Sequence, residues 1–196
     1  MVPGPQCDSD GTLSAIMSDE ADLIERWRAG DADAGAKLCQ RYLPDIERFF
    51  AGKIGREAEE LVQATFLACI EARERFRGDS SFRTFLFGIA RRQMYAFFRG
   101  RRRQDLLDFS VTSLLALDTG PITHAARNEE HRQLLDALQE LPLEQQLLIE
   151  LYYWEEMSSK DLAEIFDISQ ATVHTRLSRA RRVLRKHLVA SKGKQP

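Results

Sequence analysis

Near the C-terminus, one helical stretch gathers side chains that can form hydrogen bonds with nucleic acid. Apolar residues recur at Val173, Leu177, Ala180 and Leu184, which is the spacing of a buried helix face. Hydroxyl groups near the start of a helix and arginines farther along can donate to base edges and phosphates in the major groove. The stretch therefore predicts a DNA-reading helix, with these candidates on its other side: Gln170, Thr172, His174, Thr175, Ser178, Arg179 and Arg182.

The residues before this stretch have the pattern of a short helix followed by a tight turn. Ser158 or Ser159 can cap a helix that runs to Phe166, because a serine hydroxyl accepts a hydrogen bond from a backbone N–H of the first turn. Asp167 follows, and Asp is one of the few non-glycine residues that tolerate the left-handed conformation such turns need. Ile168 is expected to point inward and hold the two helices together. The short helix, the turn and the helix from Gln170 together predict a helix-turn-helix motif. The alternative for the second helix is an ordinary solvated helix in a bundle.

The charges of the chain are segregated, although their sum is small. The 28 Lys and Arg residues nearly balance 30 Asp and Glu residues, which gives a net charge of −2. Residues 84–103 nevertheless contain arginines and no acidic residue, and residues 168–196 contain arginines and lysines with no acidic residue. Two unmixed basic segments predict two separate contacts with a phosphate backbone. For either segment alone, the alternative is a solvated helix face.

Apolar residues recur at helical spacing through most of the rest of the chain, and no alternating strand pattern of useful length occurs. One broad apolar face is expected along 57–76, where Leu61, Val62, Phe66, Leu67 and Ile70 share it. Ser80 or Ser81 is expected to cap the aromatic-rich helix that follows. The expected helical stretches are 23–30, 36–50 with a bend at Pro44, 57–76 and 82–99.

Residues 104–128 interrupt this periodicity with short apolar pieces and turn-forming residues. We interpret this segment as a linker. The predicted fold is therefore all-α, with two small helical domains joined by a flexible linker, the C-terminal one a helix-turn-helix. The expected boundaries are a flexible acidic leader over 1–18, a first domain over 19–103, the linker over 104–128, a second domain over 129–190 and a basic tail over 191–196.

Several classes of protein are disfavoured by the composition. No apolar run approaches the roughly 20 residues that cross a bilayer. Residues 1–18 carry no Lys or Arg and so lack the charged start of a secretory signal; we expect a cytoplasmic protein without membrane insertion. Cys7, Cys39 and Cys69 fit neither a disulfide framework nor a zinc site, and Cys39 and Cys69 are expected to be small buried hydrophobes. No pattern of catalytic residues, metal ligands or cofactor-binding loops occurs.

Three segments, in this order along the chain, resemble a known family. Glu60-Leu-Val-Gln-Ala-Thr-Phe66 is similar to a polymerase clamp-binding segment, and residues 75–91 are similar to a promoter-opening segment. Ser169-Gln-Ala-Thr-Val-His-Thr-Arg-Leu-Ser-Arg-Ala-Arg-Arg-Val-Leu184 resembles the promoter-reading helix of sigma-70 family factors. The likeness is greatest to the extracytoplasmic-function (ECF) group and spans about 20–103 and 129–187.

The resemblance implies a division of labour between the two domains. The first domain is expected to be sigma region 2, which binds the polymerase clamp through Glu60 and Gln63 and opens the minus-10 element. The second is expected to be region 4, with the polar face of the helix from Gln170 on the minus-35 element. The minus-10 contacts implied are Arg77, Asp79, Ser80, Arg91, Arg92, Tyr95 and Arg99.

The resemblance also implies a set of binding partners and no catalytic activity. The expected partners are the clamp and flap of core RNA polymerase, promoter DNA, and an anti-sigma factor of the kind that holds such factors inactive. No cofactor and no enzymatic activity are expected. The alternative function is a free-standing helix-turn-helix regulator that acts without core polymerase, usually as a dimer on a two-fold site; residues 57–103 argue against it, because such a regulator has no need of them.

The segment expected to open DNA also departs from the family pattern. Arg92 stands where Asn is frequent and Ala96 where Asp is frequent, so the minus-10 preference is expected to be unusual or the contact to be mainly with phosphate. Ala64 replaces a frequent Glu, and Phe85 a frequent Trp. Stacking of an unpaired base on an aromatic ring contributes about 1–3 kcal/mol. The aromatic residues of this segment can either stack on an unpaired base or pack in the core, and the sequence leaves both open for Phe82, Phe85, Phe87, Tyr95, Phe97 and Phe98.

Overall fold

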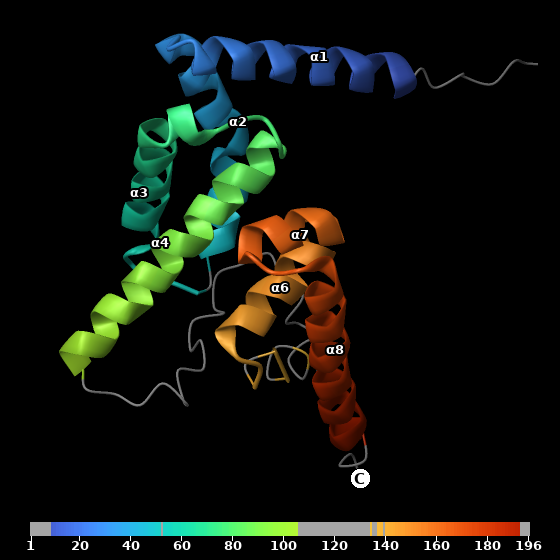
Figure 1. Ribbon diagram of the computed structural model, residues 1–196. Helices are drawn as coiled ribbons and strands as arrows, with labels where there is room; N and C mark the ends of the chain where they lie inside the picture. The colour runs from blue at the N-terminus through green and yellow to red at the C-terminus, as the bar shows by residue number, and fades with distance from the viewer. Residues whose placement is uncertain (1–8, 52, 106–133, 135–136, 139, 193–196) are drawn as a thin grey trace, which may run out of the picture.

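The computed structural model describes residues 9–51, 53–105, 134, 137, 138 and 140–192 (Figure 1). Within these ranges every extended regular element is a helix, which confirms the all-α class. The predicted linker lies outside the described residues from residue 106 onward, as do residues 1–8 and 193–196. The elements are α1 (Ser9–Arg28), α2 (Ala32–Phe50), α3 (Ala58–Glu71), the 3₁₀ turn η1 (Arg73–Arg75), α4 (Phe82–Asp105), α6 (Leu143–Tyr153), α7 (Ser159–Phe166) and α8 (Gln170–Lys192).

The helix bounds differ from the sequence-based expectation in a few places. Helix α1 begins at Ser9 and so includes part of the segment expected to be a flexible leader. Helix α2 continues through Pro44 to Phe50. Helix α3 ends at Glu71, before the expected end near Phe76, and a 3₁₀ turn follows it. Helix α4 runs past residue 99 to Asp105.

Helices α1 to α4 pack into an N-terminal bundle whose core is rich in aromatic rings. The Trp27 and Phe82 rings meet edge to face with centroids 5.2 Å apart, and Phe49 and Phe87 do so at 5.5 Å. Such pairs stabilise a core beyond the area they bury. Phe82 and Phe87 are 1% and 0% exposed. These two rings therefore belong to the core, and the choice between core and base stacking is settled for them.

Helices α6 to α8 form a second, smaller core of aliphatic side chains. Leu147, Leu151 and Leu162 are fully buried, and Val173 and Leu177 of α8 pack into the same cluster. In α6, Leu147–Ile149 are buried in succession, so this helix is enclosed on more than one side. The buried positions of α8 recur every three or four residues, so α8 turns one face inward.

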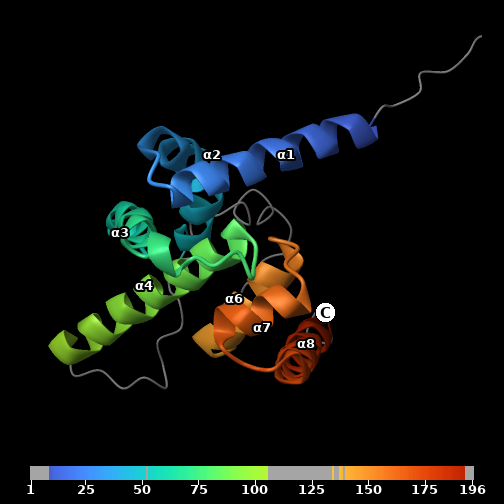
Figure 2. The same ribbon diagram turned by 45° about the horizontal axis from the view of Figure 1, so that its top comes forward.

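The two bundles lie against each other along one line of contact. Both views show α7 beside the first turns of α4, and α4 and α7 contact each other (Figures 1 and 2). Helix α8 lies on the other side of the C-terminal bundle and extends away from α4. None of the described helices is long and apolar enough to cross a membrane.

Candidate nucleic-acid interface

The helix-turn-helix forms as its sequence predicts. Ser158 is the N-cap of α7: its hydroxyl accepts a hydrogen bond from the Asp161 N–H, and the Asp161 carboxylate accepts one from the Ser158 N–H. Asp167 ends α7 in the left-handed conformation, with φ 53° and ψ 51°. Ile168 packs against the core. The capping box fixes the start of α7, and the left-handed residue ends α7 and turns the chain into α8.

Helix α8 buries one face and exposes the other. Val173, Leu177 and Ala180 are each 0% exposed, while Leu184 is half-buried. Thr172 is half-buried, and its hydroxyl lies 2.8 Å from that of Ser169 at the start of the helix. The other predicted DNA-contacting residues of this helix are exposed: Gln170, His174, Thr175, Ser178, Arg179 and Arg182.

Two side chains on the flanks of this face have roles inside the protein. The Thr175 hydroxyl donates to the Ala171 carbonyl oxygen at 2.9 Å, so its oxygen stays available as an acceptor. The Arg176 guanidinium lies 2.6 Å from the Glu144 carboxylate at the start of α6. Arg176 was not among the predicted DNA contacts, and its ion pair holds α8 against α6. The exposed cations of the predicted face are thus Arg179 and Arg182.

The loop before α4 is built around Gly78 and Ser81. Gly78 has φ +83°, a conformation that favours glycine. The Ser81 hydroxyl accepts from the Thr84 N–H at 3.0 Å, so Ser81 rather than Ser80 caps α4. Arg77 and Asp79 are exposed and Ser80 is half-buried, so the loop presents two charged side chains to solvent.

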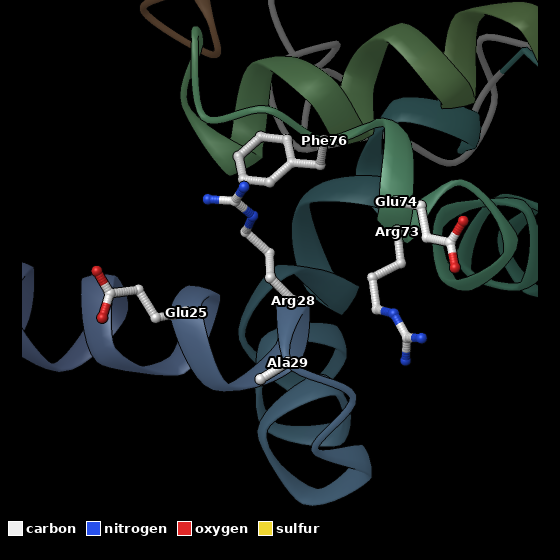
Figure 3. Close-up of a pocket in the computed structure, with 6 residues that line it drawn as sticks. All are labelled: Glu25, Arg28, Ala29, Arg73, Glu74 and Phe76. Atoms are coloured by element: carbon white, nitrogen blue, oxygen red, sulfur yellow. The ribbon is translucent and has the colours of Figure 1, made fainter.

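A hollow of about 570 Å³ lies beside this loop, between the end of α1 and η1 (Figure 3). The Arg28 guanidinium lies near the Phe76 ring, whereas Arg73 points to the other side of the hollow. Glu25 and Glu74 also line it. Two arginines and two glutamates leave the lining without a net charge, so the hollow does not favour an anionic ligand. In the described ranges, no three His, Cys, Asp or Glu residues are grouped as a metal site.

The predicted minus-10 residues of α4 lie on two different faces. Arg92 and Arg99 are exposed. Arg91, in contrast, faces the C-terminal bundle: its guanidinium lies 4.7 Å from the Phe166 ring and 4.8 Å from the Tyr95 ring. Burial, followed by the negative charge of Glu144, raises the pKa of Tyr95. Arg91 and Tyr95 therefore do not share the open surface of Arg92 and Arg99.

Helix α3 presents an unexpected apolar surface. Glu60 and Gln63 are exposed on it, as the polymerase-binding prediction requires. The single apolar face expected along this helix is wrong at two positions, because Leu67 and Ile70 are 58% and 52% exposed. Leu61 and Val62 face the core instead. The spacing of Glu60, Gln63, Leu67 and Ile70 is three or four residues, which places all four on one side of the helix; this spacing is the sequence signal that could have separated them from the core.

Comparison with known proteins gives these surfaces a family. The family model for sigma-70 region 2 matches residues 38–104, and the one for sigma-70 region 4 matches residues 131–184. The ECF RNA polymerase sigma-E factor of Haemophilus influenzae is 31% identical over 183 residues, which cover 88% of this chain and 96% of the relative. The RNA polymerase sigma-H factor of Pseudomonas aeruginosa is 29% identical over 188 residues, with the same coverage.

Solved structures agree with the sequence comparison. The structure of CnrH in complex with the cytosolic domain of CnrY has a TM-score of 0.62 and 25% identity, over 88% of this chain and 98% of that one. The sigma factor RpoE of Bartonella quintana, solved with the anti-sigma factor NepR, has a TM-score of 0.57 at 24% identity, over 81% of this chain and 96% of that one, and supports the fold.

A region 2 bundle followed by a region 4 helix-turn-helix defines a sigma factor of the sigma-70 family. The chain belongs to its extracytoplasmic-function group, as the sequence motifs indicated. It is a transcription initiation factor that binds core RNA polymerase and directs it to specific promoters. The match to sigma factors extends over both domains, and this favours polymerase-directed function over the alternative of a free-standing regulator.

Proposed function

We propose that the exposed face of α8 reads the minus-35 element, with His174, Thr175, Ser178 and Arg179 at the bases. Gln170, Thr172 and Arg182 hold phosphates on either side of them. The observation that supports this assignment is the separation of α8 into a fully buried stripe and an exposed polar face. A helix anchored in this way presents a fixed set of donors to the major groove.

The exposed part of region 2 contacts the minus-10 element. Arg77, Asp79 and Ser80 of the loop and Arg92 and Arg99 of α4 provide charged and polar groups on the open surface of the bundle. Because Arg92 stands on that surface without a nearby acidic residue in its own segment, its contact is with phosphate. Arg91 and Tyr95 join this surface only when the C-terminal bundle no longer covers them.

The exposed side of α3 docks on the polymerase clamp. Glu60 and Gln63 supply polar contacts, and Leu67 and Ile70 supply an apolar patch that a partner can cover. The variant Leu67→Ser/Ile70→Ser should bind core polymerase at least tenfold more weakly, which corresponds to about 1.4 kcal/mol. Leu43→Ser is the matched control, because Leu43 is 37% exposed on α2. Equal affinity of the double variant and the control would contradict this docking surface.

We expect the chain to act by binding rather than by catalysis, in the cytoplasm, where the polymerase and the chromosome are found. Because CnrH and RpoE were solved with CnrY and with the anti-sigma factor NepR, an anti-sigma factor is also a proposed partner of this chain.

Transcription in vitro with purified core polymerase tests the proposal as a whole. Promoter-specific transcripts that require the chain are expected. If the chain instead leaves core polymerase unbound and protects a two-fold symmetric DNA site alone, the proposal is wrong.

A further inference from the structure

The hollow between the end of α1 and η1 is lined by charged side chains of both signs. Glu25 and Arg28 reach it from α1, and Arg73 and Glu74 reach it from η1 (Figure 3). Within the described ranges, none of these four side chains forms an ion pair or a side-chain hydrogen bond. Nε of Arg73 is also buried, with no hydrogen-bond partner among the described residues. Donors and acceptors in this hollow are therefore available to a ligand.

The floor of the hollow is the Phe76 ring, which the aromatic core holds in place. Phe76 is 4% exposed. The centroid of its ring lies 6.0 Å from those of Trp27 and Phe82 and 5.0 Å from that of Phe85. The Arg28 guanidinium lies near this ring (Figure 3). Nucleobases stack on aromatic rings and on guanidinium planes, so this end of the hollow suits a planar base.

Two tight turns lie beside the two arginines of the hollow. Gly30 has φ +99°, and a Cβ on it would lie 3.5 Å from Nη1 of Arg73. Gly78 has φ +83°, and a Cβ on it would lie 4.0 Å from Nη1 of Arg28. Because Gly78 belongs to the loop over 77–81, the hollow adjoins the surface proposed to contact minus-10 DNA.

The volume and the charge of the hollow restrict what it can bind. Its volume of about 570 Å³ is typical of sites for small ligands. The lining has no net charge, so a phosphate group is not the favoured occupant. A neutral planar ring that carries both hydrogen-bond donors and acceptors matches the lining better.

Among the nucleobases, guanine fits free guanidinium and carboxylate groups most closely. Its O6 and N7 atoms are adjacent acceptors, which an arginine binds with two parallel hydrogen bonds. Its N1 and N2 atoms are adjacent donors, to which a carboxylate presents two acceptors. Each edge of adenine instead pairs one donor with one acceptor, and the pyrimidines lack the two adjacent donors. Figure 3 shows Arg73 and Glu25 on opposite sides of Arg28, so both groups can reach one base.

We propose that the hollow binds an unpaired guanine base, stacked beside Arg28, with O6 and N7 toward Arg73 and with N1 and N2 toward Glu25. This inference rests on the proposed minus-10 contact of the loop over 77–81, because DNA opened there supplies an unpaired base beside the hollow. None of the residues that line the hollow is among the proposed minus-10 contacts, so the hollow adds a separate base preference. A free guanine nucleotide carries the same base and is the other source of the ligand.

The first test measures the base preference of the holoenzyme, assembled from core polymerase and the full chain. The probe is a fluorescein-labelled oligothymidylate of about 12 nucleotides, with guanine, adenine or cytosine at one central position. The guanine probe should bind at least fivefold more tightly than the other two, because a bidentate contact discriminates to that extent. Hypoxanthine lacks the N2 amine and 7-deazaguanine lacks N7, so either base should lose most of this advantage.

Two pairs of variants assign the preference to the hollow. Arg73→Gln should abolish it, and Arg75→Gln is the control, because Arg75 is exposed in the same turn and the charge changes equally. Glu25→Gln should reduce the preference at least twofold, and Glu47→Gln, at an exposed position of α2, should leave it unchanged. A guanine preference that survives Arg73→Gln overturns the proposal.

A final test separates the two sources of the base and does not depend on DNA. Guanosine 5′-monophosphate is added to the free, full-length chain, and saturation-transfer NMR detects contact at the H8 proton of guanine. A signal that Arg73→Gln removes and Arg75→Gln retains, without a base preference in the oligonucleotide, identifies the free nucleotide as the ligand. A base preference in the oligonucleotide identifies DNA, and the absence of both effects overturns the proposal. A holoenzyme that binds the probes no better than core polymerase counts against the proposed minus-10 contact, while the nucleotide test still decides the hollow.

Discussion

The hydroxyl of Thr84, in the first turn of α4, donates a 2.8 Å hydrogen bond to Oδ1 of Asp161, in the first turn of α7. Oδ2 of the same carboxylate accepts from the Ser158 N–H at 3.2 Å. One carboxylate thus caps the first helix of the DNA-binding motif and joins it to region 2. Burial raises the pKa of Asp161, but the hydrogen bonds from Ser158 and Thr84 together outweigh burial and lower it.

Because the two roles of Asp161 are separable, two variants should differ in stability. Thr84→Val removes the contact between the bundles and the 2.8 Å hydrogen bond between the Thr84 and Ser81 hydroxyls, and leaves the Ser158 cap in place. It should lower the free energy of unfolding by about 1.5–3 kcal/mol, the range for a hydrogen bond to a charged group. Asp161→Ala also removes the cap and should cost about 1 kcal/mol more. Urea unfolding followed by circular dichroism measures both, and equal losses would contradict the double role.

The same carboxylate gives a pH dependence of known sign. A carboxyl group whose pKa is lowered by folding contributes stability above its usual pKa of 3.8, and this contribution disappears as the pH falls through the folded value. The free energy of unfolding of Thr84→Val should therefore fall less between pH 5 and lower pH than that of the wild type. Urea unfolding at a series of pH values below 5 measures this difference.

At the minus-35 element, Arg179 and Arg181 should differ although both are exposed. Arg179 lies on the polar face of α8, whereas Arg181 lies one residue from the buried Ala180 at its flank. Arg179→Ala should reduce binding to the cognate element by about 1–3 kcal/mol and relax specificity there. Arg181→Ala should have a smaller effect that is the same on all sequences. Competition binding of holoenzyme to cognate and altered minus-35 DNA distinguishes them, and a uniform loss for Arg179→Ala would assign it to phosphate.

Two helical glycines should respond to alanine in opposite directions. A Cβ on Gly35 would lie 2.8 Å from Cδ1 of Trp27, an apolar ring buried in the core. Gly35→Ala should therefore cost about 1–3 kcal/mol, as overpacking does. A Cβ on Gly88 would meet nothing within 4 Å, so Gly88→Ala should gain up to about 1 kcal/mol from helix propensity. Thermal unfolding of the two variants would contradict this if Gly35→Ala proved neutral.

The turn between α6 and α7 stores backbone strain at Glu156, whose φ is 51°. A left-handed residue with a Cβ costs about 1–2 kcal/mol, and glycine adopts the conformation without that penalty. Glu156→Gly should thus stabilise the chain by a few tenths to about 1 kcal/mol. Glu164→Gly, in the exposed interior of α7, should destabilise it by about 1 kcal/mol. Denaturant midpoints that fall for both variants would show that the φ at Glu156 carries no cost.

Cys69 should be an unreactive thiol in the folded chain. It is 1% exposed, and burial, with a smaller influence of Cys39, raises its pKa to about 12. Since the thiolate is the reactive form, alkylation by iodoacetamide at pH 8 should be slower by orders of magnitude than in urea. Because folding raises this pKa, the stability that it contributes falls as the pH rises above 9. Peptide mass spectrometry measures the rate, and similar rates in the folded and unfolded chain would exclude this burial.

Local rules were sufficient for the helix-turn-helix. The Ser158 cap, the left-handed Asp167 and the stripe of Val173, Leu177 and Ala180 depend on hydrogen bonds and side-chain positions within a few residues of one another. Cys69 is buried as predicted, while Cys39 is only half-buried. For Phe82 and Phe87, spacing alone left core and base stacking open, because aromatic rings serve both purposes.

The sequence by itself determined the all-α class, the helix-turn-helix and the polar face of α8, since helical periodicity and capping are properties of the chain. The spacing of Leu67 and Ile70 with Glu60 and Gln63 places them on one side of α3, but only the tertiary structure decided that no other helix covers this side. Only the tertiary structure, likewise, decided that Arg91 turns toward Phe166 instead of solvent. Both outcomes depend on which surfaces the other helices cover. Glu155 is a carboxylate in an acidic segment, and its hydrogen-bond partners are Arg48 and Arg83, more than 70 residues away in the chain. No local sequence pattern encodes a pairing at that separation.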